Sequence, residues 1–234
     1  MNTLLITGTD TDTGKTVLTC ALAAYWQKYC LSHRLAIMKP LQTGTGDREL
    51  YQRLFSLDQS LEEINPLHFD APLAPPIAAE REKRQVDLGK VWETLEKLRH
   101  TRDFVLIEAL GGLGSPVTHE LIVADLARDW RLPTVLVVNV KLGAIAHSVA
   151  NVALAKQKGI HLKGIILNCV KPCSEEEIAA WTPQELIESL TQIPILGIVP
   201  YLDDPTDLDK LAQVASELEL ERLLSVIPIT FAPM

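Results

Sequence analysis

The sequence predicts an α/β fold with a mostly parallel sheet and helices on both faces. Short runs of β-type residues alternate with longer helical patterns, which is typical of parallel βαβ units. With 234 residues, 47% of them hydrophobic, the chain can bury the core of one domain spanning 1–234, with two small domains as the alternative. No internal repeat or low-complexity tract interrupts the alternation.

The first βα unit carries the most specific motif. Leu4–Ile6 is typical of a buried strand, and Lys15–Leu31 is predicted to be a helix. Between them, Gly8–Thr16 has the spacing G-x-x-x-x-G-K-T of a phosphate-binding loop. Glycines let backbone N–H groups turn around an anion, and the helix directs its positive end toward it. The motif predicts a P-loop NTPase-like fold, and a chance match in a Gly- and Thr-rich turn is the alternative.

A second candidate active-site loop follows the next predicted strand. Leu35–Lys39 is a β-type run, and Pro40 cannot continue its hydrogen-bond ladder, so Lys39 is expected at the carboxyl end of the strand. Ligands in open α/β sheets bind at such ends. Lys39–Gly44 is therefore a candidate active-site loop, and a lysine that extends from a strand edge into water is the alternative.

Residues 47 to 98 are predicted to form helices around a proline-rich loop. Apolar spacing predicts a short helix from Asp47 to Leu57, and an acid in its first turn favours the helix dipole. Asn65–Pro76 holds four prolines and is predicted to cross the surface as a loop. One or two helical turns over 77–83 and an amphipathic helix over 87–98 follow.

An acid directly follows the apolar run 104–107. A carboxylate at the end of a buried strand is costly unless a cation or donors meet it, so Glu108 requires a partner. Phosphate-loop proteins use this pattern to bring a carboxylate beside the metal ion. The glycine-rich segment 109–116 then lets the backbone approach a ligand closely. An ordinary glycine-rich turn with an exposed glutamate is the alternative.

The second half of the chain continues the alternation. The predicted strands span 134–140, 164–168 and 195–199, and the predicted helices span 120–130, 143–157 and 208–220. Another helix is expected to start at Thr182, which has the spacing of a capping box with proline at the first helical position. Asn168 and the turn Pro200–Leu202 are expected side by side, where a nucleotide base would lie.

Charge and cysteine content limit the partners and the compartment. The net charge of −8 argues against binding to nucleic acid or an anionic membrane, because either would need a basic face. No apolar run approaches the roughly 20 residues of a membrane span, and no secretory signal is visible, so a soluble cytoplasmic protein is expected. The four cysteines lack zinc or disulfide spacing and are expected to be free thiols, and the six histidines lack ligand spacing.

Together, these motifs resemble the dethiobiotin synthetase family, the ATP-dependent carboxylases of biotin synthesis, over nearly the whole chain. The matching segments are Gly8–Thr11, Gly14–Thr16, Lys39-Pro40, Thr43-Gly44, Glu108, Gly111-Gly112, Pro116, Val140–Gly143, Asn168 and Pro200–Leu202. Three departures stand out. Asp12 replaces a frequent Glu, Ala109-Leu110 replaces a Gly-Ala pair, and Ala146 replaces a frequent Asn.

The resemblance implies a reaction that turns 7,8-diaminononanoate, CO₂ (or bicarbonate) and MgATP into dethiobiotin, ADP and phosphate. An amine adds to CO₂, the γ-phosphoryl group activates the carbamate as a mixed anhydride, and the neighbouring amine closes the ureido ring. Charge builds on phosphate and carbamate oxygens, so fixed cations are the catalysts required.

The resemblance also implies residue roles. Lys15, Lys39 and Thr11 would be catalytic, with Lys39 at the carbamate. Thr16, Asp47 and Glu108 would hold Mg²⁺. Nucleotide-binding residues would be Asp12, Thr13, Gly14, Lys15, Thr16, Val17, Asp47, Glu108, Gly111, Asn168, Pro200, Tyr201 and Leu202. Substrate would meet Thr43 and, from a second subunit, Gly143, Ala144 and Ile145, so a homodimer is expected.

The phosphate loop alone is compatible with other functions. A ParA/MinD-like ATPase switch usually carries an extra lysine early in the loop, and Thr9–Thr13 contains none. A small-molecule kinase would close an arginine-bearing lid, for which Arg81 and Arg84 are candidates, although they fit a solvated helix. A GTPase would need N-K-x-D, whereas the residues from Asn168 to Lys171 have the wrong order.

Overall fold

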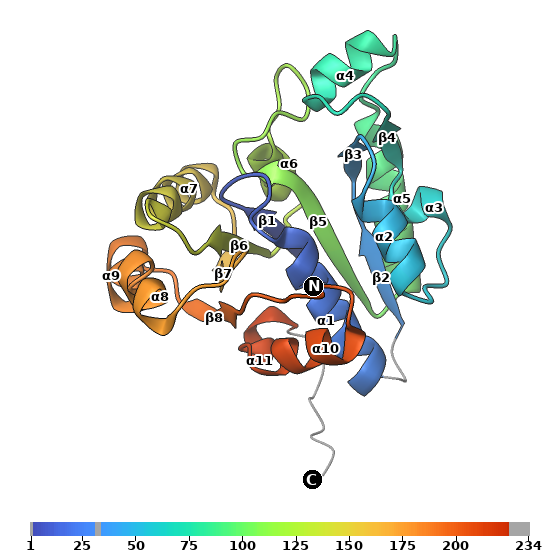
Figure 1. Cartoon of the computed structure of the whole chain (residues 1–234). Helices are drawn as coiled ribbons and strands as arrows, with labels where there is room; N and C mark the ends of the chain where they lie inside the picture. The colour runs from blue at the N-terminus through green and yellow to red at the C-terminus, as the bar shows by residue number, and fades with distance from the viewer. Residues whose placement is uncertain (1, 31–33, 225–234) are drawn as a thin grey trace.

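The computed structural model describes residues 2–30 and 34–224 (Figure 1). Its centre is a six-stranded, fully parallel sheet with the order β2-β5-β1-β6-β7-β8. The strands are β1 (Thr3–Gly8), β2 (Leu35–Met38), β5 (Phe104–Gly112), β6 (Thr134–Asn139), β7 (Leu162–Asn168) and β8 (Ile195–Val199). The predicted α/β fold with a parallel sheet is confirmed.

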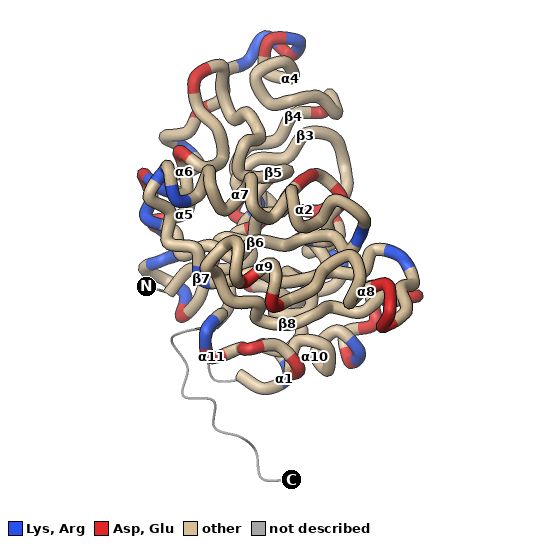
Figure 2. Tube along the Cα trace, turned by 90° about the vertical axis from the view of Figure 1, so that its left-hand side faces the viewer, with Lys and Arg blue, Asp and Glu red and all other residues tan. Residues whose placement is uncertain are grey.

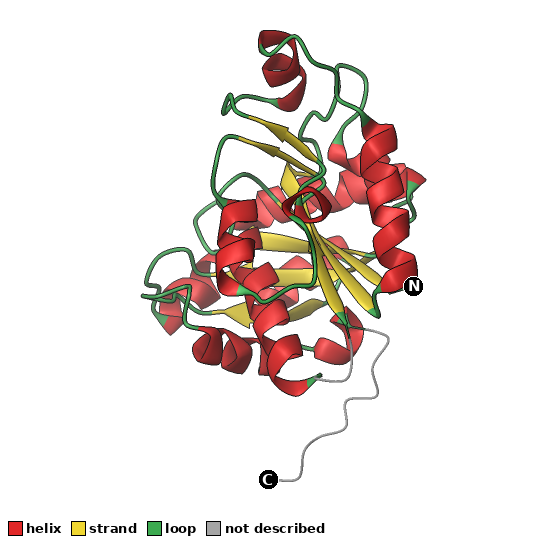
Figure 3. Ribbon diagram, turned by 90° about the vertical axis from the view of Figure 1, so that its right-hand side faces the viewer, coloured by secondary structure: helices red, strands yellow, loops and turns green. Residues whose placement is uncertain are grey.

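Helices cover both faces of this sheet, as Figure 3 shows. Successive strand residues point to opposite faces, so Leu4 and Ile6 lie in one core and Leu5 lies in the other. The first face packs against α1 (Lys15–Tyr29), α10 (Leu208–Ser216), α11 (Leu220–Leu223), α2 (Asp47–Leu54) and α3 (Leu61–Ile64). The second packs against α5 (Leu88–Thr101), α6 (Val123–Asp129), α7 (Ala144–Lys158), α8 (Glu175–Trp181) and α9 (Gln184–Thr191).

The predicted surface loop over Asn65–Pro76 is wrong in its middle. Leu67–Phe69 forms β4, which pairs in parallel with β3 (Leu41–Thr43) in a separate two-stranded sheet. At the end of the same segment, α4 (Pro75–Arg81) begins with its two prolines in the first turn. Strands of three residues carry too little local pattern to be recognised, and a pairing between distant segments decides them.

The predicted helix after Thr182 is present as α9, which begins at Gln184, but the capping box predicted for it is wrong, because its N-cap is Pro183. The Thr182 hydroxyl donates to the carbonyl of Ile178 and so belongs to the end of α8, a helix that the sequence analysis did not predict. Ser174 and Glu177 form the capping box of α8 instead.

Several helix ends also differ from the prediction. The structure ends α1 at Tyr29, and the predicted end at Leu31 lies outside the described residues. The helix predicted to end at Leu57 ends at Leu54, and the helix predicted over 120–130 begins at Val123. The predicted closing helix breaks after Ser216.

Two composition-based expectations can be compared with the described residues. Cys20, Cys30, Cys169 and Cys173 are free thiols, as predicted. Within 2–30 and 34–224, no helix combines the length and the apolar character that a bilayer crossing requires.

Figure 2 shows basic and acidic residues interspersed along the trace, with acidic residues gathered on α8.

Candidate active site

A cleft of about 800 Å³ opens where the central strands end. Its walls come from the loop after β1, the end of β2, β3, the first turn of α2 and the second half of β5. The strand predicted to end at Glu108 continues to Gly112, because its backbone keeps pairing with β1 beyond the apolar run. Because β5 lies between β2 and β1 in the sheet, the phosphate-binding loop, Lys39 and Glu108 meet at one edge. The predicted site residues that line it are Thr11, Asp12, Gly14, Lys15, Thr16, Val17, Lys39, Thr43, Asp47, Glu108 and Gly111.

The phosphate-binding loop is held from β7, which lies two strands away from β1 in the sheet. Asn168 Nδ2 donates to the carbonyl of Thr13 over 2.9 Å. Gly14 has a φ of +91°, and a Cβ there would lie only 2.0 Å from Asn168 Nδ2, so both backbone and space require glycine. Lys15 Nζ donates to the carbonyl of Asp10 over 3.0 Å, and burial lowers the pKa of Lys15. The loop thus presents a buried amine whose described hydrogen bond is to a neutral carbonyl.

Lys39 is held between two carboxylates. Its Nζ lies 2.6 Å from Asp47 Oδ2 and 2.6 Å from Glu108 Oε1. Burial works to lower the pKa of Lys39, but the charges of Glu108 and Asp47 outweigh it and raise that pKa. In the same way, burial works to raise the pKa of Asp47, but Lys39 and a hydrogen bond from Thr16 lower it. The three groups form an ion cluster in which Lys39 is cationic and Asp47 anionic.

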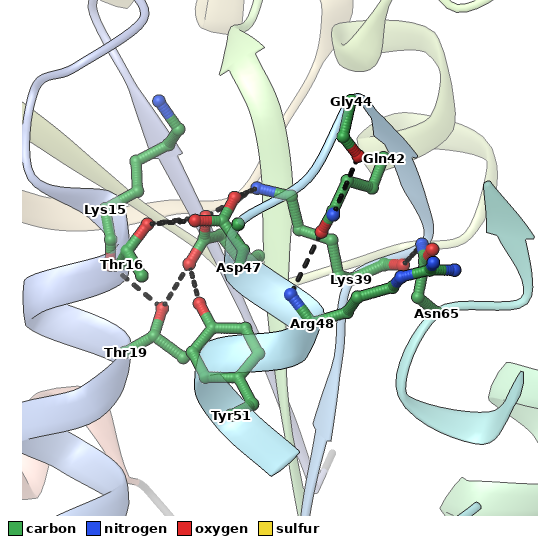
Figure 4. Close-up of polar contacts among 12 residues, drawn as sticks. Lys15, Thr16, Thr19, Lys39, Gln42, Gly44, Asp47, Arg48, Tyr51 and Asn65 are labelled. Carbon is green, nitrogen blue, oxygen red and sulfur yellow. Dashed lines mark hydrogen bonds and ion pairs between the residues drawn. The ribbon is translucent and has the colours of Figure 1, made fainter. Parts of the chain in front are cut away.

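Thr16 joins the same cluster from the start of α1. Its Oγ1 lies 3.1 Å from Asp47 Oδ1 and 3.1 Å from Glu108 Oε1. Figure 4 shows Thr16, Asp47 and Lys39 pointing toward one another. A hydroxyl and two carboxylates are oxygen ligands of the kind that Mg²⁺ prefers. These three donors fit Mg²⁺ and leave the remaining positions of its octahedron to phosphate oxygens and water. Within the described ranges, no group of three or more His, Cys, Asp or Glu residues could hold a metal ion.

Sequence reasoning missed two residues behind Glu108. Thr19 Oγ1 lies 3.1 Å from Glu108 Oε2, and the Tyr51 hydroxyl donates to the same oxygen. Burial raises the pKa of Tyr51 well above its usual value, so the phenol stays protonated. Helical spacing was the available signal, since Tyr51 follows Asp47 by one turn and Thr19 follows Lys15 by one turn.

Another wall of the cleft was missed as well. It comes from the segment that the sequence analysis placed on the surface, and its lining residues there are Pro72, Leu73, Ala74 and Pro75. Gln42 completes this wall, and its amide donates to the carbonyl of Gly44 and accepts from Arg48 N. Proline content predicts irregular backbone, but it does not tell which way such a segment faces.

The remaining predicted site residues lie outside the lining of the cleft. Thr13 and Asn168 form the brace described above. Asn168 pairs with Val199 across β7 and β8, which places it next to the turn Pro200–Leu202. Gly143 is the N-cap of α7, and Ala144 and Ile145 are its first two residues. Leu142, directly before them, is 84% exposed.

Comparison with known proteins adds sequence relatives. Residues 2–208 match a family model described as an AAA domain. The ATP-dependent dethiobiotin synthetase BioD of Gloeothece citriformis (strain PCC 7424) is 60% identical over 224 residues, which cover 96% of this chain and 99% of the relative. The protein of the same name from Crocosphaera subtropica (strain ATCC 51142 / BH68) is 57% identical over 223 residues, which cover 95% and 100%.

Solved structures add neighbours in fold. The cell division ATPase MinD of Pyrococcus furiosus superposes with a TM-score of 0.58 at 17% identity, covering 95% of this chain and 100% of MinD. The septum site-determining protein MinD of Pyrococcus horikoshii OT3, complexed with Mg-ADP, has a TM-score of 0.55 at 18% identity, with coverage of 96% and 92%. Identities this low show a shared P-loop NTPase fold and nothing more specific.

Proposed function

The chain belongs to the ATP-dependent dethiobiotin synthetase family and is an ATP-dependent ligase of biotin biosynthesis, and we propose that its reaction takes place in the cleft around Lys15, Lys39 and Glu108. In this reaction, 7,8-diaminononanoate, CO₂ and ATP become dethiobiotin, ADP and phosphate. One observation supports the location above all. Two buried lysines and the oxygen cluster of Thr16, Asp47 and Glu108 line the same cleft at the strand ends.

The chemistry explains why these groups are needed. One amine of the substrate adds to CO₂ and loses a proton, giving a carbamate. A carbamate oxygen attacks the γ-phosphorus, and ADP leaves with the electrons of the broken P–O bond. The second amine attacks the carbamoyl carbon, loses a proton and expels phosphate as the ring closes. Charge therefore moves among oxygens throughout, and preorganised cations lower the barriers.

Each lysine has its own part in the proposal. Lys15 binds the outer phosphates of ATP, because its amine stands in the phosphate-binding loop with a neutral carbonyl as its described partner. Lys39 contacts the carbamate and the transferring phosphoryl group, because its ammonium stands at the strand end that faces the loop. Thr11 and Thr43 also line the cleft and would hydrogen-bond the carbamate or the amines.

We assign Thr16, Asp47 and Glu108 to Mg²⁺. Bound there, the ion would neutralise charge on the phosphoryl group during transfer. The two carboxylates already lie within hydrogen-bond distance of one hydroxyl and one ammonium, which supports a shared cation site. In the structure, the ammonium of Lys39 balances the negative charge of Asp47 and Glu108, which is the charge that Mg²⁺ would bind.

The nucleotide base and the substrate tail complete the proposal. Asn168 and the turn Pro200–Leu202 would border the base. In a homodimer, Gly143–Ile145 of a second subunit would hold the substrate carboxylate at the start of α7, where the positive end of the helix dipole favours an anion. Ala144 N already donates to the carbonyl of Lys141 over 3.0 Å. The exposed Leu142 beside that turn would be covered in such a dimer. The remaining parts of the proposal are a cytoplasmic location and only small-molecule partners besides the second subunit.

Substrate-dependent ATP turnover tests the function directly. ADP release from the purified protein is measured with diaminononanoate, with bicarbonate, with both and with neither. We expect turnover only with both, and ¹³C-bicarbonate should place its label in dethiobiotin detected by mass spectrometry. Turnover that ignores the diamine and rises with DNA or a protein partner would instead support an ATPase switch.

A further inference from the structure

The two oxygens of Glu108 have different surroundings. The residue is fully buried within β5, four residues before the strand ends at Gly112. Oε1 faces the cleft, where it meets Lys39 Nζ at 2.6 Å and Thr16 Oγ1 at 3.1 Å. Oε2 faces the interior, where Thr19 and Tyr51 contact it. One carboxylate oxygen of Glu108 is therefore available to ligands in the cleft, and the other is hydrogen-bonded to the protein interior.

The hydroxyl protons behind Glu108 can be counted. Thr19 Oγ1 has two acceptors, the carbonyl of Lys15 at 2.9 Å and Glu108 Oε2 at 3.1 Å, but only one proton to donate. The bond to Lys15 is the local one within α1, so the proton of Thr19 is shared. Within the described part of the chain, the hydrogen bond of the Tyr51 hydroxyl goes to Glu108 Oε2. Tyr51 is the donor dedicated to this oxygen.

Tyr51 also links Glu108 to the helix that carries the other carboxylate. Asp47 is the first residue of α2, and Tyr51 follows it by four residues, so both lie on one face of the helix. The start of α2 is fixed by Gly46 N, which donates to Glu49 Oε2, and by Arg48 N, which donates to Gln42 Oε1. One anchored helix thus holds Asp47 directly and Glu108 through a phenol.

We propose that Tyr51 is a positioning residue that orients Glu108, so that the placement of both carboxylates toward Mg²⁺ depends on α2. This inference rests on the proposed assignment of Thr16, Asp47 and Glu108 to the metal. Tyr51 is fully buried and would touch neither substrate nor nucleotide. Its loss should therefore change how the site holds the ion, rather than how the loop holds the phosphates.

The test is the magnesium dependence of ATP binding in Tyr51→Phe, measured by calorimetry. Loss of a partner that orients a metal ligand commonly weakens metal affinity by about 10- to 100-fold, so half-saturation should require at least about tenfold more Mg²⁺. ATP binding in the presence of EDTA should stay unchanged. Tyr25→Phe is the matched control, because it removes the hydroxyl of another buried tyrosine, on α1, and should leave both measurements unchanged.

A double-mutant cycle separates orientation from general damage. In a Glu108→Gln background, adding Tyr51→Phe should cause little further change in Mg²⁺ dependence, because the two residues act as one unit. A full additional effect, or an unchanged Mg²⁺ dependence in Tyr51→Phe alone, would overturn the proposal.

If Tyr51→Phe does not fold, Thr19→Val gives the answer. Because its proton is shared with the carbonyl of Lys15, we expect a rise in half-saturating Mg²⁺ of only about threefold, as for a hydrogen bond at the weak end of the usual range. A tenfold rise would assign the role to Thr19 and overturn the assignment to Tyr51. These measurements of Mg²⁺ and ATP binding do not use the carboxylation assay. If the protein makes no dethiobiotin but its variants show the expected changes in Mg²⁺ dependence, only the proposed function is refuted.

Discussion

Lys15 and Lys39 face the same cleft, and their surroundings are opposite. Lys15 donates to the neutral carbonyl of Asp10 over 3.0 Å, and burial lowers its pKa. Lys39 stands 2.6 Å from each of two carboxylates, whose charges raise its pKa in spite of burial. One lysine has no ion pair described within 2–30 and 34–224, and the other already has two.

The difference indicates how each wall of the cleft meets an anionic nucleotide. The loop of Lys15 is ready for phosphate, because a buried amine without a carboxylate partner gains most from an incoming anion. Lys39 becomes available to substrate oxygens only when another cation compensates Asp47 and Glu108. We therefore expect Lys15 and the phosphate-binding loop to determine how tightly ATP binds. We expect Lys39, with Asp47 and Glu108, to determine the rate of the chemical steps.

The largest effect is expected from Lys39→Gln. Loss of a preorganised charge that acts in the transition state should lower kcat by roughly 10³-fold, while ATP affinity stays close to that of the wild type. Initial rates of dethiobiotin formation and calorimetric ATP titrations measure the two quantities. Lys90→Gln, at an exposed position on α5, is the control. Ordinary turnover in Lys39→Gln would remove Lys39 from the mechanism.

The complementary variant is Lys15→Gln. A charge-assisted hydrogen bond to phosphate contributes about 1.5–3 kcal/mol, so the Kd for ATP should rise by about 10- to 150-fold. Equilibrium binding of ATP reports this change. A variant that binds ATP normally and loses only kcat would give both lysines the same role and so contradict the division between the walls.

Asn168→Ala, which removes the brace on the phosphate-binding loop, should weaken ATP binding less than Lys15→Gln does. The bond from Asn168 Nδ2 to Thr13 O is a neutral hydrogen bond, whose loss should weaken ATP binding by about 1 kcal/mol, or about fivefold. If Asn168 acts only as a brace, ATP and GTP should lose affinity equally. A loss confined to ATP would mean that Asn168 contacts the base.

The smallest effect is expected at the anchor of α2. Burial works to raise the pKa of Glu49, but hydrogen bonds from Arg48 and from Gly46 N lower it from 4.5 to about 2. A carboxyl with a lowered pKa stabilises the fold above pH 4.5 and loses that contribution as the pH falls toward 2. Because the side chain of Glu49 is 42% exposed, solvent screens its charge, and the stability difference should be below about 1 kcal/mol at pH 7.

Urea unfolding of the wild type and Glu49→Gln measures this difference. It should shrink steadily between pH 4.5 and pH 2, the interval between the two pKa values. A difference that stays constant across this interval would mean that the carboxylate of Glu49 does not stabilise α2 through its charge.

Local sequence determined the frame of the site. Gly8–Thr16 joins a strand to a helix, and Lys39 follows a short apolar run, so the place of Lys39 after β2 could be predicted. Glu108 also follows an apolar run, but β5 continues past it to Gly112, so its predicted place at the strand end is wrong. These features are readable because an apolar run, a glycine or a proline acts on its own neighbours in the chain. The parallel sheet then brings all such ends to one edge.

Only the tertiary structure decided which side chains meet there. The bond from Tyr51 to Glu108, the brace from Asn168 to Thr13 and the pairing of β3 with β4 each join segments far apart in sequence. Periodicity tells which face of a helix is apolar, but it does not name the group across from that face. Partner choice depends on how the elements pack, so it appears only when the whole chain is folded.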